Sequence, residues 1–169
     1  MSAREIVLLG DPILRARAAA VGSFDDELRE LVRDMFDTMY SAEGAGLAAP
    51  QVGVGIRVIV AEIVEEGVAP VRVVLVNPEI VETSDEIDRD SEGCLSIPGV
   101  SEVVARPASV TVQGLDPTGS PVRVEAGGLL ARVLQHEVDH VNGVLFIDRL
   151  TPLKRRILLQ KYRKLGAKD

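Results

Sequence analysis

The sequence is poor in the residues typical of disulfide-bonded, aromatic-rich or membrane-spanning proteins. It has one cysteine, Cys94, so no disulfide can form within the chain, which favours a reducing compartment. Aromatic residues make up only 3% of the chain, so we expect a core of aliphatic side chains. The apolar run Ile6–Leu9 is too short for a signal peptide, and Val71–Val76 is interrupted by Arg72. We therefore expect a cytoplasmic protein that does not enter a membrane.

The length and charge of the chain predict one domain with a basic C-terminal segment. The 169 residues fit a single domain, 1–169, and 46% hydrophobic with 27% charged residues is an ordinary globular mixture. The net charge is −7, but residues 154–169 carry seven basic residues and one acid, a net +6, so the remainder carries −13. This asymmetry predicts either a solvated helix face or a tail that binds a polyanion.

Helical periodicity predicts three helices. The first follows Ser23 as N-cap, places Asp25 and Asp26 in its first turn, and ends near residues 43–44. The second runs from about 128 to 142, with an apolar stripe and an Asn-Gly stop. The third opens at Thr151 with proline at its first position and covers the basic segment 151–166.

Between the first two helices the pattern predicts β-structure. Stretches rich in β-branched residues are bounded by Gly, Pro or Asp at 56–63, 71–76, 104–113 and 122–125. The Asp-Pro-Thr-Gly turn at 116–119 predicts that the last two strands form a hairpin. Strands clustered in mid-chain and flanked by helices predict an α+β fold, with mixed or antiparallel sheets around the helix that carries residues 128–142.

Both histidines of the chain lie in one motif, His136-Glu137-Val138-Asp139-His140. A spacing of four residues on a helix places both imidazoles on one face, where a single metal ion can reach both. Glu137 can then reach a water on that metal and act as its general base. The alternative is that the two histidines are ordinary surface or core residues. This alternative is weakened because the chain has only two histidines and both fall in the motif.

A catalytic metal usually has three protein ligands and an open position. There is no third histidine, but Cys94 lies in Glu92-Gly93-Cys94-Leu95-Ser96. A lone cysteine is often a small buried hydrophobic residue. Gly93 and Pro98 instead indicate a shaped loop, which makes Cys94 a candidate third ligand. A further segment rich in small residues, 44–51, permits close backbone approach, or is simply a helix-to-strand turn.

Together these three segments resemble the peptide deformylase family of bacterial type. The resemblance is carried by Gly44-x-Gly-Leu-Ala-Ala-x-Gln51, by Glu92-Gly-Cys-Leu-Ser96 and by Gln135-His-Glu-x-Asp-His140, in that order, and continues through residues 142–148 and the Pro-Leu-Lys opening of the last helix. It covers essentially the whole chain.

The resemblance implies hydrolysis of the N-formyl group from the formyl-methionine of newly made polypeptides, with release of formate. It implies metal ligation by Cys94, His136 and His140, and proton transfer from water to the leaving amine by Glu137. It assigns oxyanion stabilisation to the Gln51 amide and the Leu95 backbone N–H, and substrate hydrogen bonding to the Gly46 backbone. Gly46 and Gln51 lie in the first of the three motifs, and Leu95 lies in the second.

The methionine side chain needs an apolar pocket. Leu129, Arg132 and Val133 precede His136 by seven, four and three residues, so helical spacing places them on the ligand-bearing face. We expect Arg132 to lay its stem along the pocket with its head in water. For Leu129 and Val133 the alternative is plain core packing. Some relatives carry an arginine just after the cysteine motif that helps to hold the peptide. Here the first arginine after the motif is Arg106, so the sequence does not predict how residues beyond methionine are recognised. Arg106 could instead pair with an acid such as Glu92 or Asp139.

Two imidazoles and a thiolate suit Zn, Fe(II), Co or Ni. The family resemblance favours Fe(II) as the native ion, with zinc, nickel or cobalt as possible replacements. It also favours ribosome docking by the basic last helix, because phosphate contacts suit a +6 segment and the substrates are nascent chains. We expect no DNA partner and a monomer.

The competing functions are a zinc endopeptidase, which the missing third histidine disfavours, and a non-catalytic metal-binding or ribosome-associated protein, which Glu137 and Gln51 disfavour.

Overall fold

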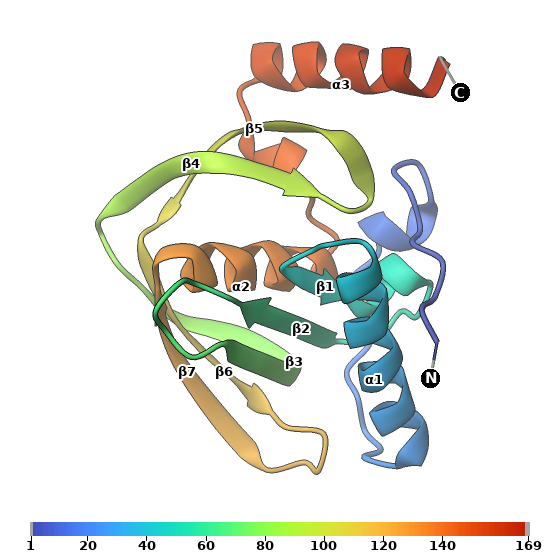
Figure 1. The fold of residues 1–169 in the computed structure, drawn as a ribbon, viewed down its shortest axis with the longest axis vertical. Helices are drawn as coiled ribbons and strands as arrows, with labels where there is room; N and C mark the ends of the chain where they lie inside the picture. The colour runs from blue at the N-terminus through green and yellow to red at the C-terminus, as the bar shows by residue number, and fades with distance from the viewer. Residues whose placement is uncertain (1, 168–169) are drawn as a thin grey trace.

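The computed structural model describes residues 2–167, and its elements are arranged as shown in Figure 1. The helices are η1 (Pro12–Arg15), α1 (Asp26–Ser41), η2 (Ala49–Val52), α2 (Gly128–Val141), η3 (Phe146–Arg149) and α3 (Pro152–Ala167), where η marks a 3₁₀ helix. The strands are β1 (Gly46–Ala48), β2 (Val58–Ile63), β3 (Val71–Thr83), β4 (Ile87–Cys94), β5 (Ile97–Pro107), β6 (Ser109–Leu115) and β7 (Pro121–Gly127). Within residues 2–167, none of the helices combines the length and the apolar run that crossing a bilayer requires.

The three expected α-helices are present, and one of their caps differs from the prediction. The N-cap of α1 is Asp25 rather than Ser23, because the Asp25 carboxylate accepts a hydrogen bond from the Leu28 N–H at 3.0 Å. Helix α2 matches its predicted range and ends at Asn142 as C-cap. Helix α3 opens at Pro152, with the Thr151 hydroxyl accepting from the Lys154 N–H.

The strands confirm an α+β fold with antiparallel sheets. A five-stranded sheet has the order β1-β2-β3-β6-β7, and β4 pairs with β5 in a separate two-stranded ribbon. The predicted hairpin at 116–119 joins β6 to β7. The prediction of one strand over 104–113 is wrong: β5 ends at Pro107 and β6 begins at Ser109, since the chain leaves the ribbon there and enters the sheet.

The layers of the molecule place α2 at its centre, as Figure 1 shows. Side chains of β2 alternate between the two faces of the sheet, so that Ile59 and Ala61 pack with α2 while Val58 and Val60 pack with α1. The ribbon lies over the opposite side of α2, and α3 lies outside the ribbon. A third apolar cluster joins the ribbon, η1, η3 and α3; its fully buried members are Leu14, Ile97, Val104, Leu145, Phe146, Ile147 and Leu158.

The ribbon was only partly expected from the sequence. Strand β4 reads Ile-Asp-Arg-Asp-Ser-Glu-Gly-Cys, and most of its residues are exposed. A strand with so few apolar residues lacks the alternation by which a half-buried strand is recognised. Its position matters because Cys94 is its last residue and Glu92 is the one buried residue along it.

Candidate metal centre

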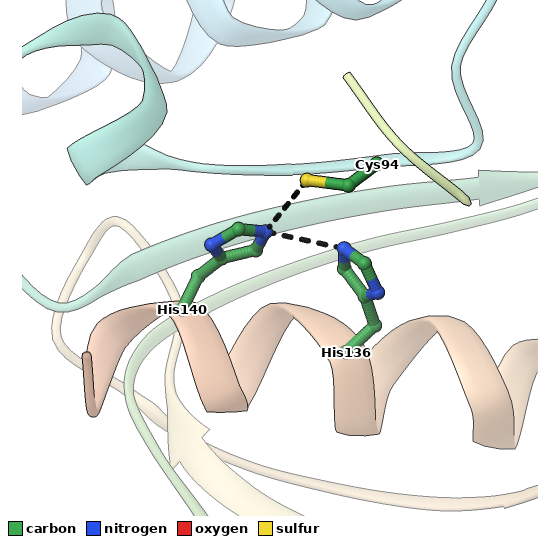
Figure 2. A group of neighbouring side chains, drawn as sticks. All are labelled: Cys94, His136 and His140. Atoms are coloured by element: carbon green, nitrogen blue, oxygen red, sulfur yellow. Dashed lines mark hydrogen bonds between the residues drawn. The ribbon is translucent and has the colours of Figure 1, made fainter. Parts of the chain in front are cut away.

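Cys94, His136 and His140 converge on one point between the ribbon and helix α2. The two histidines lie one turn apart on α2, and their rings meet the Cys94 sulfur, as Figure 2 shows. Cys94 is the last residue of β4. The His140 Nε2 atom is 3.1 Å from the His136 Nε2 atom and 3.4 Å from the Cys94 sulfur. The three ligand atoms lie within 4.8 Å of one another.

This donor set fits a four-coordinate metal ion. Metal–nitrogen bonds of about 2.0–2.1 Å and metal–sulfur bonds of about 2.3 Å in a tetrahedron separate the ligand atoms by roughly 3.3 Å for two nitrogens and 3.6 Å for nitrogen and sulfur. The two distances above are close to these values, while the Cys94 sulfur and the His136 Nε2 atom are the most widely separated pair, within 4.8 Å. Three protein donors leave a fourth position for water or substrate, the arrangement of catalytic rather than structural sites.

A buried carboxylate fixes the orientation of one ligand. The Glu92 Oε2 atom lies 2.7 Å from the Nδ1 atom of His136. This contact favours the proton on Nδ1, so that Nε2 is left with a lone pair for a metal. Burial alone would raise the pKa of Glu92, but hydrogen bonds from Arg106 and His136 outweigh it and hold that pKa well below its usual range. Glu92 is therefore ionised and adds negative charge beside the metal ligands.

Arg106 pairs with both of the acids proposed from the sequence. Its guanidinium donates to the two Glu92 oxygens at 2.7 and 2.6 Å and to Asp139 Oδ2 at 3.1 Å. Arg106 is 3% exposed, so these charges neutralise one another away from water. Arg149 binds the same Asp139 carboxylate from the outer side.

Glu137 lies beside the metal ligands with one oxygen unengaged. It is 4% exposed, and burial raises its pKa to about 7. Among the described residues, its Oε1 atom is buried without a hydrogen-bond partner, as is the Nδ1 atom of His140. Burial also lowers the pKa of His140 well below its usual value, which keeps that imidazole neutral as a ligand. A buried, unpaired carboxylate oxygen beside a metal site is suited to accept a proton from water.

Gly46 brings strand β1 against this carboxylate. Gly46 pairs with Ala61, and the Glu62 N–H donates to the Ala45 carbonyl. This register makes Gly46 a non-hydrogen-bonded position, whose own N–H and C=O point away from β2. Since β1 is an edge strand, these groups face the cleft described below and are free to bind an extended peptide.

The Gln51 side chain is held with its amide nitrogen toward the metal ligands. Its Oε1 accepts from the Ala48 N–H at 3.0 Å, and its Nε2 donates to the Ser96 hydroxyl at 3.1 Å and lies 3.6 Å from the Cys94 sulfur. Leu95 and Ser96 form the turn between β4 and β5. The Gln51 amide and the Leu95 backbone therefore approach the metal ligands from η2 and from the ribbon, respectively.

A cleft of about 420 Å³ connects these groups. It is lined by β1, the ribbon and α2, and the candidate residues on its wall are Gly46, Gln51, Cys94, Leu95, Leu129, Arg132, Val133, His136 and Glu137. The expected pocket residues thus line the cleft, but the expectation for Arg132 is wrong. Its head is not in water: the residue is 5% exposed, and its guanidinium hydrogen-bonds Glu92 and the ribbon backbone.

Three functional contacts were missed from the sequence. Ser96 holds the Gln51 amide, Glu92 orients His136, and Arg132 binds the ribbon. Only Glu92 had a local signal, because a residue two positions before Cys94 on a strand shares its face. The other two are long-range contacts that no spacing along the chain indicates.

Comparison with known proteins supports one family. The family model described as polypeptide deformylase matches residues 3–156. The peptide deformylase of Brucella suis biovar 1 is 48% identical over 167 residues, which are 99% of this chain and 95% of that protein. The crystal structure of a peptide deformylase from Legionella pneumophila superposes with a TM-score of 0.87 at 48% identity, covering 99% of both chains. That of the Ehrlichia chaffeensis peptide deformylase in complex with actinonin gives 0.90 at 41% identity, covering 97% of this chain and 98% of that one.

Proposed function

The chain belongs to the polypeptide deformylase family of metallo-hydrolases, which remove the N-formyl group from nascent polypeptides, and we propose that its metal ligands for this reaction are Cys94, His136 and His140. The observation that carries this proposal is the convergence of the three ligand atoms to within 4.8 Å beside the unpaired Glu137 oxygen. The proposed catalytic domain is the single domain 1–169, because ligands from the ribbon and from α2 must come together to form the site.

The protein residues have separable roles in the proposed hydrolysis. Cys94, His136 and His140 would hold a divalent ion, which when bound would lower the pKa of water and polarise the formyl oxygen. Glu137 would accept a proton from the attacking water and pass it to the leaving amine through its Oε1 atom, which has no hydrogen-bond partner among the described residues. The Gln51 amide and the Leu95 N–H donate to the oxygen on which negative charge develops. The outward-facing N–H and C=O of Gly46 bind the substrate backbone.

The methionine side chain of the substrate occupies the cleft wall formed by α2 in this proposal. Leu129 and Val133 offer apolar surface there, and Arg132 lines the same wall. The head of Arg132 is turned away from solvent, into a buried ion pair with Glu92. Arg106 is not available to bind substrate residues beyond methionine, because its buried guanidinium is paired with Glu92 and Asp139.

Fe(II) is the proposed native metal. Two imidazoles and one thiolate suit iron, zinc, cobalt and nickel alike, and the family resemblance favours the ferrous ion. The proposed place of action is the cytoplasm, where formylated nascent chains arise and where the thiol of Cys94 stays reduced. Metal analysis and activity should be measured on one sample prepared without oxygen. Full activity with zinc alone would contradict the iron assignment.

The basic helix α3 is the proposed contact with the ribosome. Its bases Lys154, Arg156, Lys161, Arg163 and Lys164 are exposed, while it rests on the protein through Leu158 and its neighbours. Lys168, which also belongs to the basic segment, lies outside the described residues. An exposed row of bases on an otherwise acidic protein is suited to phosphate contacts with ribosomal RNA.

Replacement of Glu137 by alanine is the direct test of the mechanism. A general acid–base contributes about 10²–10⁴-fold, so formate release from a formyl-methionyl peptide should fall by at least the lower figure while bound metal per chain stays the same. The same samples should be assayed for cleavage of internal peptide bonds. A variant that retains nearly full formate release would rule out Glu137 as the base, and cleavage of internal bonds by the unaltered protein would indicate an endopeptidase.

A further inference from the structure

The proposed metal site is divided between two parts of the fold that share no strand pairing. Cys94 ends the β4–β5 ribbon, which forms a sheet of its own, and both histidines belong to α2. A two-stranded ribbon by itself is at best marginally stable. The position of Cys94 relative to the histidines therefore depends on the side chains that hold the ribbon against α2.

Arg132 makes that connection to both strands of the ribbon. It lies on α2 one turn before His136, and its Nη2 atom donates to the Asp88 carbonyl of β4 at 3.0 Å. Its Nη1 atom donates to the Val104 carbonyl of β5, also at 3.0 Å. The same Nη1 atom lies 3.0 Å from Glu92 Oε1, and Nη2 lies 3.3 Å from Asp88 Oδ2. One planar guanidinium thus binds two strands and a carboxylate simultaneously from two separate nitrogens, a spread of donors that the single nitrogen of an ammonium group lacks.

We propose that Arg132 is a positioning residue, which fixes Cys94 relative to His136 and His140 by holding the ribbon against α2. This inference rests on the proposed metal site. The same connection sets the separation of two walls of the cleft, because both the ribbon and α2 line it. Arg132 acts through the backbone carbonyls of the ribbon and through Glu92, which contacts His136 directly.

Arg132 can be tested more cleanly than Arg106. Removal of Arg106 would leave Glu92 without its two-pronged partner, and an unpaired buried charge is strongly destabilising. In Arg132→Met, Glu92 keeps both hydrogen bonds from Arg106 and its contact with His136. The methionine side chain retains much of the volume, while the two ribbon carbonyls lose their donor.

Arg149→Met is the matched control. Arg149 belongs to the same group of ion pairs and binds Asp139 through two hydrogen bonds, at 2.7 and 3.2 Å. It lies on η3 and is not among the residues that line the cleft. Like Arg132→Met, this replacement removes one positive charge from the group of ion pairs. It leaves the hydrogen bonds between Arg132 and both strands of the ribbon in place.

The experiment uses the full chain loaded with Co(II), whose visible absorption bands report ligand geometry. We expect Arg132→Met to shift these bands and to speed Co(II) release to a chelator by about 10- to 100-fold, the range found when groups that orient metal ligands are removed. Arg149→Met should show the bands and the release rate of the unaltered protein. Thermal unfolding of each metal-free variant separates a general loss of stability from an effect on the site.

The outcomes are distinguishable from failure of the metal site itself. Unchanged bands and release rate in Arg132→Met would overturn the positioning role, even if that variant unfolds at a lower temperature. If Arg132→Met does not fold, Arg132→Lys replaces it, because lysine keeps the charge but cannot bind both strands, and the same shift is expected. Cys94→Ala tests the ligand set itself. If its Co(II) bands are the same as those of the unaltered protein, the proposed ligand set is wrong, irrespective of the results for Arg132→Met.

Discussion

Gly46 approaches Glu137 so closely that a Cβ atom on Gly46 would lie 2.7 Å from the Glu137 Oε2 atom. The same Cβ would lie 2.7 Å from Val133 Cγ1. The absence of a side chain at position 46 thus lets edge strand β1 pass directly over the proposed base. Strand β1 can then present the Gly46 backbone to a substrate within reach of that base.

Gly46→Ala should therefore reduce activity by displacing Glu137. A misplacement of about 1 Å in a catalytic group can cost about 10²-fold in rate, and we expect a fall of that order in kcat/KM for a formyl-methionyl peptide. Metal content should not change, because the three atoms nearest to the new methyl group belong to Glu137 and Val133 rather than to a metal ligand. Gly22→Ala is the control, since a Cβ there meets no atom within 4 Å. Full activity of Gly46→Ala would show that β1 yields easily at this point.

Gln51→Ala should lower kcat with little change in KM. Its amide is fixed by the Ala48 N–H and Ser96 hydroxyl, and loss of one oxyanion donor typically costs about 10²–10³-fold in kcat. Ser96→Ala is the matched control, because it removes only the acceptor that steadies the amide. We expect it to lose about tenfold or less, the equivalent of one net hydrogen bond. Equal losses in the two variants would indicate that Gln51 acts structurally.

The elements that carry the histidines could be predicted from sequence because their signals are local. Helix α2 has an apolar stripe, a following Asn-Gly and two histidines four residues apart, all within one segment. Helix periodicity alone places both imidazoles on one face. The prediction that Arg106 pairs with Glu92 or Asp139 also agrees with the structure, which shows both contacts.

The ribbon and the environment of Arg132 could not be predicted in the same way. Strand β4 is mostly exposed, so its residues lack the alternating pattern of a half-buried strand. Arg132 was expected to place its head in water, because arginine usually does. Its partners Asp88 and Glu92 lie about forty residues earlier in the chain, as the separations of 44 and 40 positions show. Contacts at such separations depend on the packing of the whole fold.

Asp148 should stabilise the fold at neutral pH and lose that effect in acid. Burial alone would raise the pKa of Asp148, but hydrogen bonds from Arg15 and from the Leu145 N–H outweigh it and lower that pKa below its usual 3.8. A group with a lowered folded-state pKa stabilises the protein above its unfolded pKa, and this contribution is lost as the pH falls through the folded value. Asp148→Asn should thus have a lower free energy of unfolding than the unaltered protein at pH 7.

The difference between these two proteins should shrink as the pH falls below about 4. Urea unfolding across a pH series, with a chelator present throughout to keep the metal-free state, measures it. Asp85→Asn removes an exposed carboxylate and serves as the control, with no expected change at neutral pH. A difference for Asp148→Asn that is the same at pH 3 and pH 7 would exclude the ion pair with Arg15 as its cause.

Charge reversal on α3 is a sharper test of ribosome docking than removal of the helix. Leu158 is 3% exposed and packs in the same apolar cluster as Ile97 of the ribbon, so deletion of α3 would uncover the core next to the metal site. Replacing exposed Lys154, Lys161 and Lys164 by glutamate leaves that packing intact. This triple variant should lose salt-sensitive co-sedimentation with ribosomes and retain full hydrolysis of a small formyl-peptide, because phosphate contacts dominate such binding.

The control replaces exposed Arg17, Arg33 and Arg89 by glutamate, which alters the net charge equally at other places on the surface. If both triple variants bind ribosomes equally, α3 is not the docking element; if only the α3 variant fails to bind, the bases of that helix carry the contact.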